Sequence, residues 1–196
     1  KARGFDNKQH IKTLNGSEIL TENANDDPEA LSRYSPTLVI YEEIGKGKKG
    51  WSLKVAENVH PSLYVLGKKT GYQIYIGTGG NMDKGVTDLQ TRTYNPSQHN
   101  CLSFTNKWKK ENDTGNVKVT HFNPAYIYKI VDEDGNPKVK ESIEYILKER
   151  ETKSPQQKYI HVSHQAIYLE DVFQATTGGY FGPERARLLM QRYNYI

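Results

Sequence analysis

Two short runs of β-branched and aromatic residues, at positions 62–67 and 72–77, constrain the fold of this chain more than any other feature. The four residues between them end in Gly71, and a short turn of this kind between two such runs is typical of a β-hairpin. Residues 63–77 are therefore predicted to form an antiparallel hairpin with Tyr64 on one strand and Tyr75 on the other. The short turn keeps the two phenol groups near each other, and the register decides whether they share a face.

The hairpin is followed by a predicted helix. Glycines within 77–80 break the second strand, and Asn81 or Asp83 can cap a helix that runs toward Arg92 and stops before Pro96. Other segments show the periodicity or composition of strands and helices. Strands are predicted at 37–43, 51–55, 117–122 and 125–131, and helices at 28–34, 140–151, 165–175 and 183–193.

These elements place the chain in the α+β class. We expect a small antiparallel sheet with a central two-tyrosine hairpin flanked by helices, plus extra N-terminal strands and C-terminal helices. A length of 196 residues suits one domain of ordinary size. Within it we expect an N-terminal arm and hairpin over 1–60, a core over 61–156, and a C-terminal helical extension over 157–196.

The composition indicates a thin hydrophobic core and a wet binding surface. Only 35% of the residues are hydrophobic, and 14 tyrosines against five phenylalanines favour half-buried grooves over an oily pocket. The single cysteine, Cys101, excludes an internal disulfide and indicates a reducing, cytoplasmic compartment. Apolar runs are too short for a membrane span or a secretory signal, so no membrane partner is expected.

The basic residues cluster although the formal net charge is only +4. Such clusters beside glycines or at turns suit a polyanion, whereas the alternative is that they are solvated loop lysines. The lysines predicted to bind a nucleic-acid backbone are Lys48, Lys49, Lys68, Lys69, Lys109 and Lys110.

The two tyrosine segments, Leu63-Tyr64-Val65 and Ile74-Tyr75-Ile76-Gly77, resemble the hallmark of the GIY-YIG nuclease family. The similarity continues through residues 75–86 as the family's Tyr-Ile-Gly strand, small-residue turn and first helix. A later glutamate of the family is matched by Glu144, which lies between Ile143 and Tyr145 in the predicted helix. The resemblance covers residues 62–94 and, more loosely, 141–155.

The resemblance implies a metal-dependent DNA endonuclease, here of restriction type because the flanking segments are available for recognition of a sequence in double-stranded DNA. Hydrolysis of a phosphodiester requires a base, a cation and a metal clamp. The family's pattern implies Tyr64 as base, Tyr75 as partner of the phosphate or water, and Glu144 as ligand of Mg²⁺ or Mn²⁺. Where the family has an arginine on the early helix this chain has Gly85. The phosphate clamp is therefore assigned to Arg92, with Lys84 as the alternative.

Several rival interpretations remain open at this point. A non-catalytic nucleic-acid-binding module would use the same tyrosines for stacking and the lysines for the backbone. A toxin of the ADP-ribosyltransferase type is a weaker alternative, because the arginine-then-Ser-Thr-Ser order is missing. His161 and His164 are interpreted as hydrogen-bonding or surface histidines near a strand end. Enzymes that cut both strands at symmetric sites are often dimers, so a homodimer is expected.

Overall fold

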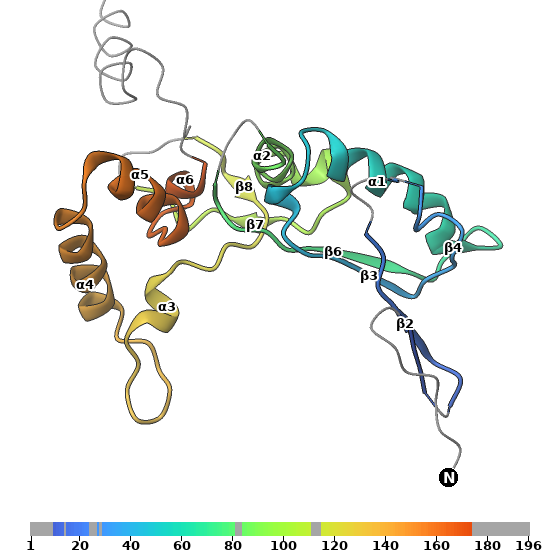
Figure 1. The fold of residues 1–196 in the computed structure, drawn as a ribbon, viewed down its shortest axis with the longest axis horizontal. Coiled ribbons are helices and arrows are strands. Elements are labelled where there is room, and N and C mark those ends of the chain that lie inside the picture. The colour runs from blue at the N-terminus through green and yellow to red at the C-terminus, as the bar shows by residue number, and fades with distance from the viewer. Residues whose placement is uncertain are drawn as a thin grey trace, which may run out of the picture. The chain divides into compact units, whose positions relative to one another are not determined.

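The computed structural model describes residues 10–13, 15–23, 27, 29–80, 84–110 and 115–173 (Figure 1). Helices and small sheets both occur, which confirms the α+β class. The chain divides into two compact units: unit 1 contains Lys1–Ile40 and Trp51–Ile74, and unit 2 contains Tyr41–Gly50 and Tyr75–Ile196. No helix in the described part of the chain combines the length and the apolar composition needed to cross a membrane.

Unit 1 combines two short hairpins with one helix. The first hairpin is antiparallel and pairs Ile11 with Ile19. The elements of unit 1 are β1 (His10–Lys12), β2 (Glu18–Leu20), α1 (Trp51–Val59), the 3₁₀ helix η2 (His60–Leu63), β4 (Tyr64–Val65) and β5 (Lys68–Lys69). It also holds most of two further strands, β3 (Leu38–Tyr41) and β6 (Tyr72–Tyr75), whose last residues belong to unit 2.

Helix α1 replaces the strand that was predicted at 51–55, so that prediction was wrong. The buried residues of α1 are Ser52, Val55, Ala56 and Val59, which follow the i, i+3, i+4, i+7 spacing of one helical face. Val55 and Val59 are fully buried. Residues 51–55 alone contain a tryptophan and a valine, which favour a strand. The helical spacing of the buried residues becomes visible only when residues up to Val59 are included.

The hairpin that carries Tyr64 is shorter than predicted. Strands β4 and β5 pair antiparallel, with Tyr64 opposite Lys69 and Val65 opposite Lys68. The turn is made by two residues with positive φ, Leu66 at 50° and Gly67 at 76°, as in the tight turns that match the twist of a hairpin. The predicted pairing of 62–67 with 72–77 is thus absent among the described residues, because the chain turns at 66–67 instead of 68–71.

Strand β6 pairs with β3 rather than with β4. The Tyr72 N–H donates to the Thr37 carbonyl (3.1 Å), and the Ile76 N–H donates to the Tyr41 carbonyl (2.9 Å). The partners advance in the same direction along both segments, which is the pattern of a parallel pair. A parallel pair needs a crossover connection of a dozen or more residues, and the segment that contains α1 supplies it. The sheet that carries Tyr75 therefore departs from the predicted antiparallel hairpin.

Unit 2 is mainly helical. Residues that were predicted as a helix over 140–151 form α4, and Pro155 begins the following helix behind the N-cap Ser154. The elements of unit 2 are η1 (Ile44–Lys46), α2 (Val86–Tyr94), η3 (Pro96–His99), β7 (Phe104–Thr105), β8 (Lys118–Val119), α3 (Tyr126–Lys129), α4 (Val139–Glu151), α5 (Pro155–His164) and α6 (Leu169–Val172).

The structure corrects three further predictions in unit 2. Strand β8 pairs with β7, and α3 occupies the place of the second predicted strand at 125–131. His161 and His164 lie in α5 and not near a strand end. Within the predicted helix 165–175, α6 covers only Leu169–Val172. The predicted helix 183–193 falls outside the described residues. Strand β7 was not predicted, because a strand of two residues is too short to show an alternation of polar and apolar residues.

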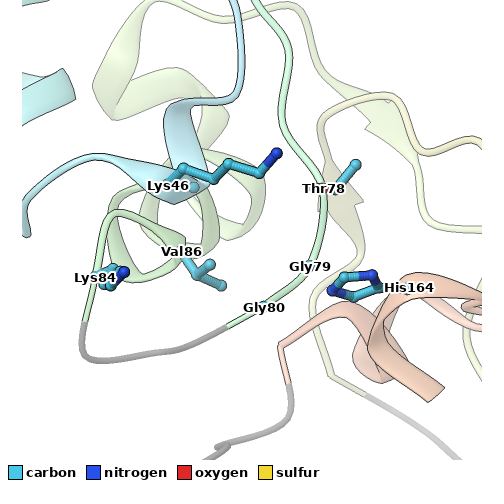
Figure 2. A pocket seen from close by; sticks show the side chains of 8 residues that line it. Lys46, Thr78, Gly79, Gly80, Lys84, Val86 and His164 are labelled. Carbon is cyan, nitrogen blue, oxygen red and sulfur yellow. The ribbon is translucent and has the colours of Figure 1, made fainter. Parts of the chain in front are cut away.

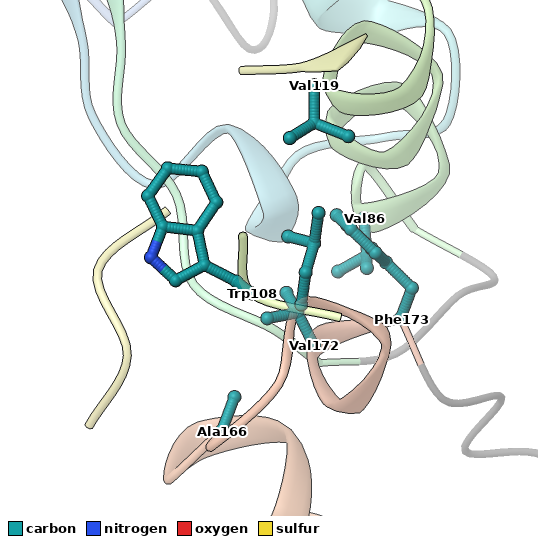
Figure 3. Close-up of a cluster of buried hydrophobic side chains, with 7 residues drawn as sticks. Val86, Trp108, Val119, Ala166, Val172 and Phe173 are labelled. Carbon is teal, nitrogen blue, oxygen red and sulfur yellow. The ribbon is translucent and has the colours of Figure 1, made fainter. Parts of the chain in front are cut away.

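A buried hydrophobic cluster of unit 2 joins α2 to α6 (Figure 3). Val86 from the start of α2 and Val119 from β8 are almost completely buried. They pack in one cluster with Trp108, Ala166, Leu169, Val172 and Phe173. Burial of such side chains contributes about 1.5 to 3 kcal/mol each for the larger aliphatic residues. The cluster fixes the N-terminal end of α2, which in turn positions Arg92 two turns further along the helix.

Candidate functional site

Two stacked tyrosines form the centre of the candidate site in unit 2. Tyr41 ends β3 and Tyr75 ends β6, so the parallel pairing of the strands brings the two rings together. Their centroids are 4.8 Å apart and the ring planes differ by 6°. Tyr41 is 4% exposed, whereas Tyr75 is partly exposed. The Tyr75 ring therefore lies between a buried aromatic neighbour and the surface of the unit.

Arg92 lies on Tyr75 from the last turn of α2. Its guanidinium carbon is 4.0 Å from the centroid of the Tyr75 ring, within the range of a cation–π contact. The guanidinium also donates hydrogen bonds to the Tyr75 hydroxyl and to the Cys101 sulfur. Arg92 is only 4% exposed, so these contacts hold a cation that is largely removed from water. The sequence assigned Arg92 to the phosphate clamp; the structure places it against Tyr75, and its role in binding phosphate stays a prediction.

Burial determines the protonation of the site. It raises the pKa of the Tyr75 hydroxyl to about 12, although the Arg92 guanidinium acts in the opposite direction. Burial, and after it the neighbouring Tyr75, also raises the pKa of Tyr41. The pKa of the Cys101 thiol is raised by burial as well. At neutral pH both tyrosines are therefore neutral phenols, which donate a hydrogen bond but are poor bases.

Two close contacts hold the start of α2 against the segment that follows β3. The Asp88 carboxylate is buried and accepts a hydrogen bond from the Gly50 N–H (2.8 Å). The Gly85 N–H donates to the Gly47 carbonyl (2.8 Å). A Cβ atom on Gly85 would collide with the Ile44 carbonyl oxygen, so only glycine allows this approach.

A pocket of about 170 Å³ follows the Tyr-Ile-Gly segment in unit 2 (Figure 2). The Lys46 side chain extends toward the segment that carries Thr78, and the His164 ring lies beside Gly79. The side chains and backbone that line the pocket include Lys46, Thr78, Gly79, Gly80, Lys84 and His164. Lys84 and His164 are exposed. The two clamp candidates from the sequence are thus separated: Arg92 contacts Tyr75, whereas Lys84 lines the pocket.

Tyr64 and Glu144 lie elsewhere in the chain. Tyr64 belongs to unit 1, where it is 39% exposed and its ring contacts His60 at 5.2 Å between centroids. Glu144 is on the exposed side of α4, and α4 packs against α3 and α5. Within the described part of unit 2, no hydrogen bond or ion pair joins Glu144 to Tyr75 or Arg92. The structure therefore brings together one of the two predicted tyrosines and the predicted arginine, but not the predicted metal ligand.

The predicted backbone-binding lysines are mostly exposed. Lys48 and Lys49 lie in the loop before α1, and Lys68 and Lys69 form β5, where the Lys69 ammonium is 5.2 Å from the centroid of the Tyr72 ring. Lys110 differs, because its ammonium lies 3.9 Å from the buried Asp171 carboxylate. Lys109 is half-buried. The positions of Lys48, Lys49, Lys68 and Lys69 agree with lysines that remain in water, and the role of all six lysines in DNA binding stays a prediction.

Tyr41 was missed by the sequence interpretation. A signal was present, because Ile40-Tyr41 and Ile74-Tyr75 end two similar short apolar runs. The expected spacing of about ten residues between the tyrosines directed attention to Tyr64 instead. Comparison of the chain with protein-family models, curated proteins and solved structures finds no match.

Proposed function

We propose that this chain is a restriction-type endonuclease that hydrolyses phosphodiester bonds in double-stranded DNA. The observation that carries this proposal is the buried Arg92 guanidinium, held by the ring and hydroxyl of Tyr75 at the start of the Tyr-Ile-Gly segment. The non-catalytic nucleic-acid-binding module is the alternative outcome of the experiment below. The single cysteine agrees with action in a reducing, cytoplasmic compartment.

Arg92 supplies the cation that the reaction requires. A guanidinium is planar, always charged and able to donate two parallel hydrogen bonds to phosphate oxygens. Tyr75 and Cys101 are neutral groups, so their contacts orient Arg92 without adding a negative charge next to it. Stabilisation of the charge that develops on the phosphate is usually the largest single contribution to such a reaction. We assign this role to Arg92.

Tyr75 acts as a hydrogen-bond donor in this proposal. Because burial raises its pKa to about 12, the phenol keeps its proton at neutral pH. A neutral phenol beside the guanidinium can donate to a phosphate oxygen or orient the attacking water. That water forms the new P–O bond and passes a proton to a base, while the bond to the leaving oxygen breaks and this oxygen takes a proton from solvent. The assignment of the base to Tyr64 stays a prediction from the sequence.

The metal requirement also stays a prediction. Mg²⁺ keeps several waters and is bound through one or two carboxylates together with substrate phosphates, so a single glutamate is a suitable donor. Glu144 is exposed and makes no hydrogen bond or ion pair within the described residues. It is nevertheless not joined to the Tyr75–Arg92 pair, so the present arrangement does not fit a shared ion. We assign no step of the reaction to Mg²⁺ or Mn²⁺.

The proposal is tested by incubating the chain with plasmid and phage DNA in Mg²⁺, in Mn²⁺ and in EDTA. We expect discrete fragments with either metal and none in EDTA. Tyr75→Phe removes the hydroxyl but keeps the ring against Tyr41, and Arg92→Lys keeps a charge but loses the planar fork. Each is expected to lower the cleavage rate by about 10²-fold or more.

Tyr128→Phe is the matched control, since Tyr128 is 59% exposed and lies on α3. It should cut like the wild type. Circular dichroism and the unfolding midpoint show whether Tyr75→Phe and Arg92→Lys are folded. If the wild type binds DNA but cleaves it under none of these conditions, the chain is a nucleic-acid-binding module and not a nuclease. Equal cleavage by the wild type and both folded variants would show that Tyr75 and Arg92 take no part in the reaction.

A further inference from the structure

The pocket beyond Tyr75 has the chemistry of an anion site. Among its described lining residues are two lysines, a histidine and a threonine hydroxyl, and none of them is a carboxylate. The Lys84 ammonium and the His164 ring make no hydrogen bond or ion pair with any residue that the structure describes. The Lys84 ammonium and the His164 imidazole are therefore available to a ligand.

The carboxylate of Glu43 marks a position at which a negative charge contacts residues of the pocket. One oxygen of its carboxylate, Oε2, lies 3.2 Å from the Lys46 ammonium and accepts a hydrogen bond from the Thr78 hydroxyl (3.4 Å). Lys46 and Glu43 are respectively 74% and 47% exposed in their side chains, so this ion pair is weak. Lys46 and Thr78 thus converge on one negatively charged oxygen. A phosphate oxygen in that position competes with Glu43 at small cost.

The backbone of the pocket is tightly fixed. Gly79 passes so close to α5 and α6 that an added Cβ atom would lie 2.5 Å from the Ser163 carbonyl oxygen and 2.7 Å from that of Val172. This close packing holds the segment beside His164, the last residue of α5. Helix α2 begins at Val86, which also lines the pocket, and the positive end of a helix dipole favours an anion.

We propose that this pocket binds one phosphate group of the DNA backbone next to the bond that is cut. The inference rests on the proposed function. Thr78 lies three positions after Tyr75, and an extended chain covers at most about 10 Å over that length. Successive phosphates of one DNA strand rise about 3.4 Å along the helix axis and lie further apart than this in space, so the pocket suits the phosphate next to the one at Tyr75. Arg92 then holds the scissile phosphate, and Lys46, Lys84, Thr78 and His164 hold its neighbour.

The test measures binding of a short DNA duplex by fluorescence anisotropy in EDTA over a series of KCl concentrations. Each phosphate that a protein neutralises contributes about 0.9 to the slope of log affinity against log salt concentration. We expect the double variant Lys46→Ala/Lys84→Ala to lower this slope by about 1. Its affinity should fall about tenfold, and Lys84→Arg should bind like the wild type. The control Lys148→Ala/Lys158→Ala removes two exposed lysines of α4 and α5 and should change the slope by less.

Glu43→Gln provides a second measurement with the opposite sign. It removes the carboxylate that occupies Lys46 and Thr78, so the affinity for DNA should rise several-fold. Glu133→Gln removes the same charge from the exposed turn between α3 and α4 and should have a smaller effect. Unchanged slope and affinity in Lys46→Ala/Lys84→Ala would overturn the pocket while leaving the cleavage proposal standing. A lowered slope in a chain that never cuts DNA would support the pocket and overturn the nuclease.

Inorganic phosphate distinguishes the source of the phosphate group. Titration is followed by calorimetry with the wild type and with Lys46→Ala/Lys84→Ala. We expect weak binding of free phosphate to the wild type alone, together with competition against the duplex. Saturable binding of phosphate that leaves duplex affinity unchanged would mean that the pocket serves a small phosphorylated ligand, and the DNA assignment would be overturned.

Discussion

At the scale of single residues, Arg92 and Tyr75 determine the chemistry of the site. A buried cation is costly unless its surroundings compensate for the lost water. Here the face of the Tyr75 ring lies 4.0 Å from the guanidinium carbon, and the hydroxyl of the same residue accepts a hydrogen bond from Arg92. The arginine cannot lose its proton in the working range of a protein. The pair therefore offers a fixed positive charge and a neutral phenol over that range.

The pH dependence of stability tests this description. The pKa of Tyr75 is raised by burial to about 12 in the folded chain, above the value of about 10 expected after unfolding. A raised pKa contributes stability below pH 10, and this contribution is lost as the pH rises through the folded value. The free energy of unfolding should therefore fall between about pH 10 and pH 12. The fall should be smaller in Tyr75→Phe, and an equal fall in both proteins would contradict the buried phenol.

The sequence predicted part of this site and missed the rest for a physical reason. Arg92 follows the Tyr-Ile-Gly segment on an amphipathic helix, so its contact with Tyr75 depends on nearby residues and was predictable. Tyr41 reaches Tyr75 through the pairing of β3 with β6, which is a long-range contact. Local patterns carry little information on which distant strands pair. The choice of Tyr64 as the partner followed from the predicted hairpin and from the spacing of the two tyrosines.

At the scale of elements, the β4–β5 hairpin turns through a residue that is poorly suited to it. Leu66 has φ of 50° and is 99% exposed, whereas glycine or asparagine normally occupies such a position. The prediction that the chain turns at 68–71 relied on Gly71. That glycine serves a different purpose, because a Cβ atom there would collide with the Pro36 carbonyl oxygen and lie close to the Leu63 side chain.

Leu66→Asn is expected to stabilise the chain. It creates the Asn-Gly pair that two-residue hairpin turns prefer, and it relieves a left-handed conformation that costs about 1 kcal/mol for a residue such as leucine. The midpoint of urea unfolding should rise accordingly. Leu102→Asn replaces another exposed leucine, 81% exposed and without positive φ, and should leave the midpoint unchanged. A loss of stability in Leu66→Asn would show that residues 66 and 67 do not form the turn of this hairpin.

At the scale of the whole molecule, the helical half of unit 2 depends on a buried ion pair. The Asp171 carboxylate lies 3.4 Å from Arg150 and accepts hydrogen bonds from the N–H groups of Ile167 (3.1 Å) and Tyr168 (3.3 Å). Arg150 also donates to the Gln165 carbonyl (2.7 Å). One carboxylate thus connects α4, α6 and the segment between α5 and α6. The two contacts of Arg150 have no sequence signature, since they join α4 to residues 15 and 21 positions further along the chain.

Removal of this carboxylate should weaken unit 2 strongly. Asp171→Ala leaves Arg150 buried without its carboxylate partner and removes an acceptor from two backbone N–H groups, so a loss of about 3 to 5 kcal/mol is expected. Chemical denaturation followed by circular dichroism measures it. Asp134→Ala removes an exposed carboxylate from the turn before α4 and should cost little. Similar unfolding midpoints for the two variants would show that the pair adds nothing to stability.

The crossover between β3 and β6 has an evolutionary consequence. Positions 41 and 75 meet in space, and residues 51–69 between them belong to unit 1, so this part of the intervening segment is an excursion that leaves the ring pair and returns to it. Each doubling of a loop's length costs only about 0.6 kcal/mol. Such an excursion can grow, shrink or be exchanged while the two rings stay in register. Related chains would then share the geometry of the paired phenols without sharing any fixed interval between them, which hides their kinship from searches based on spacing.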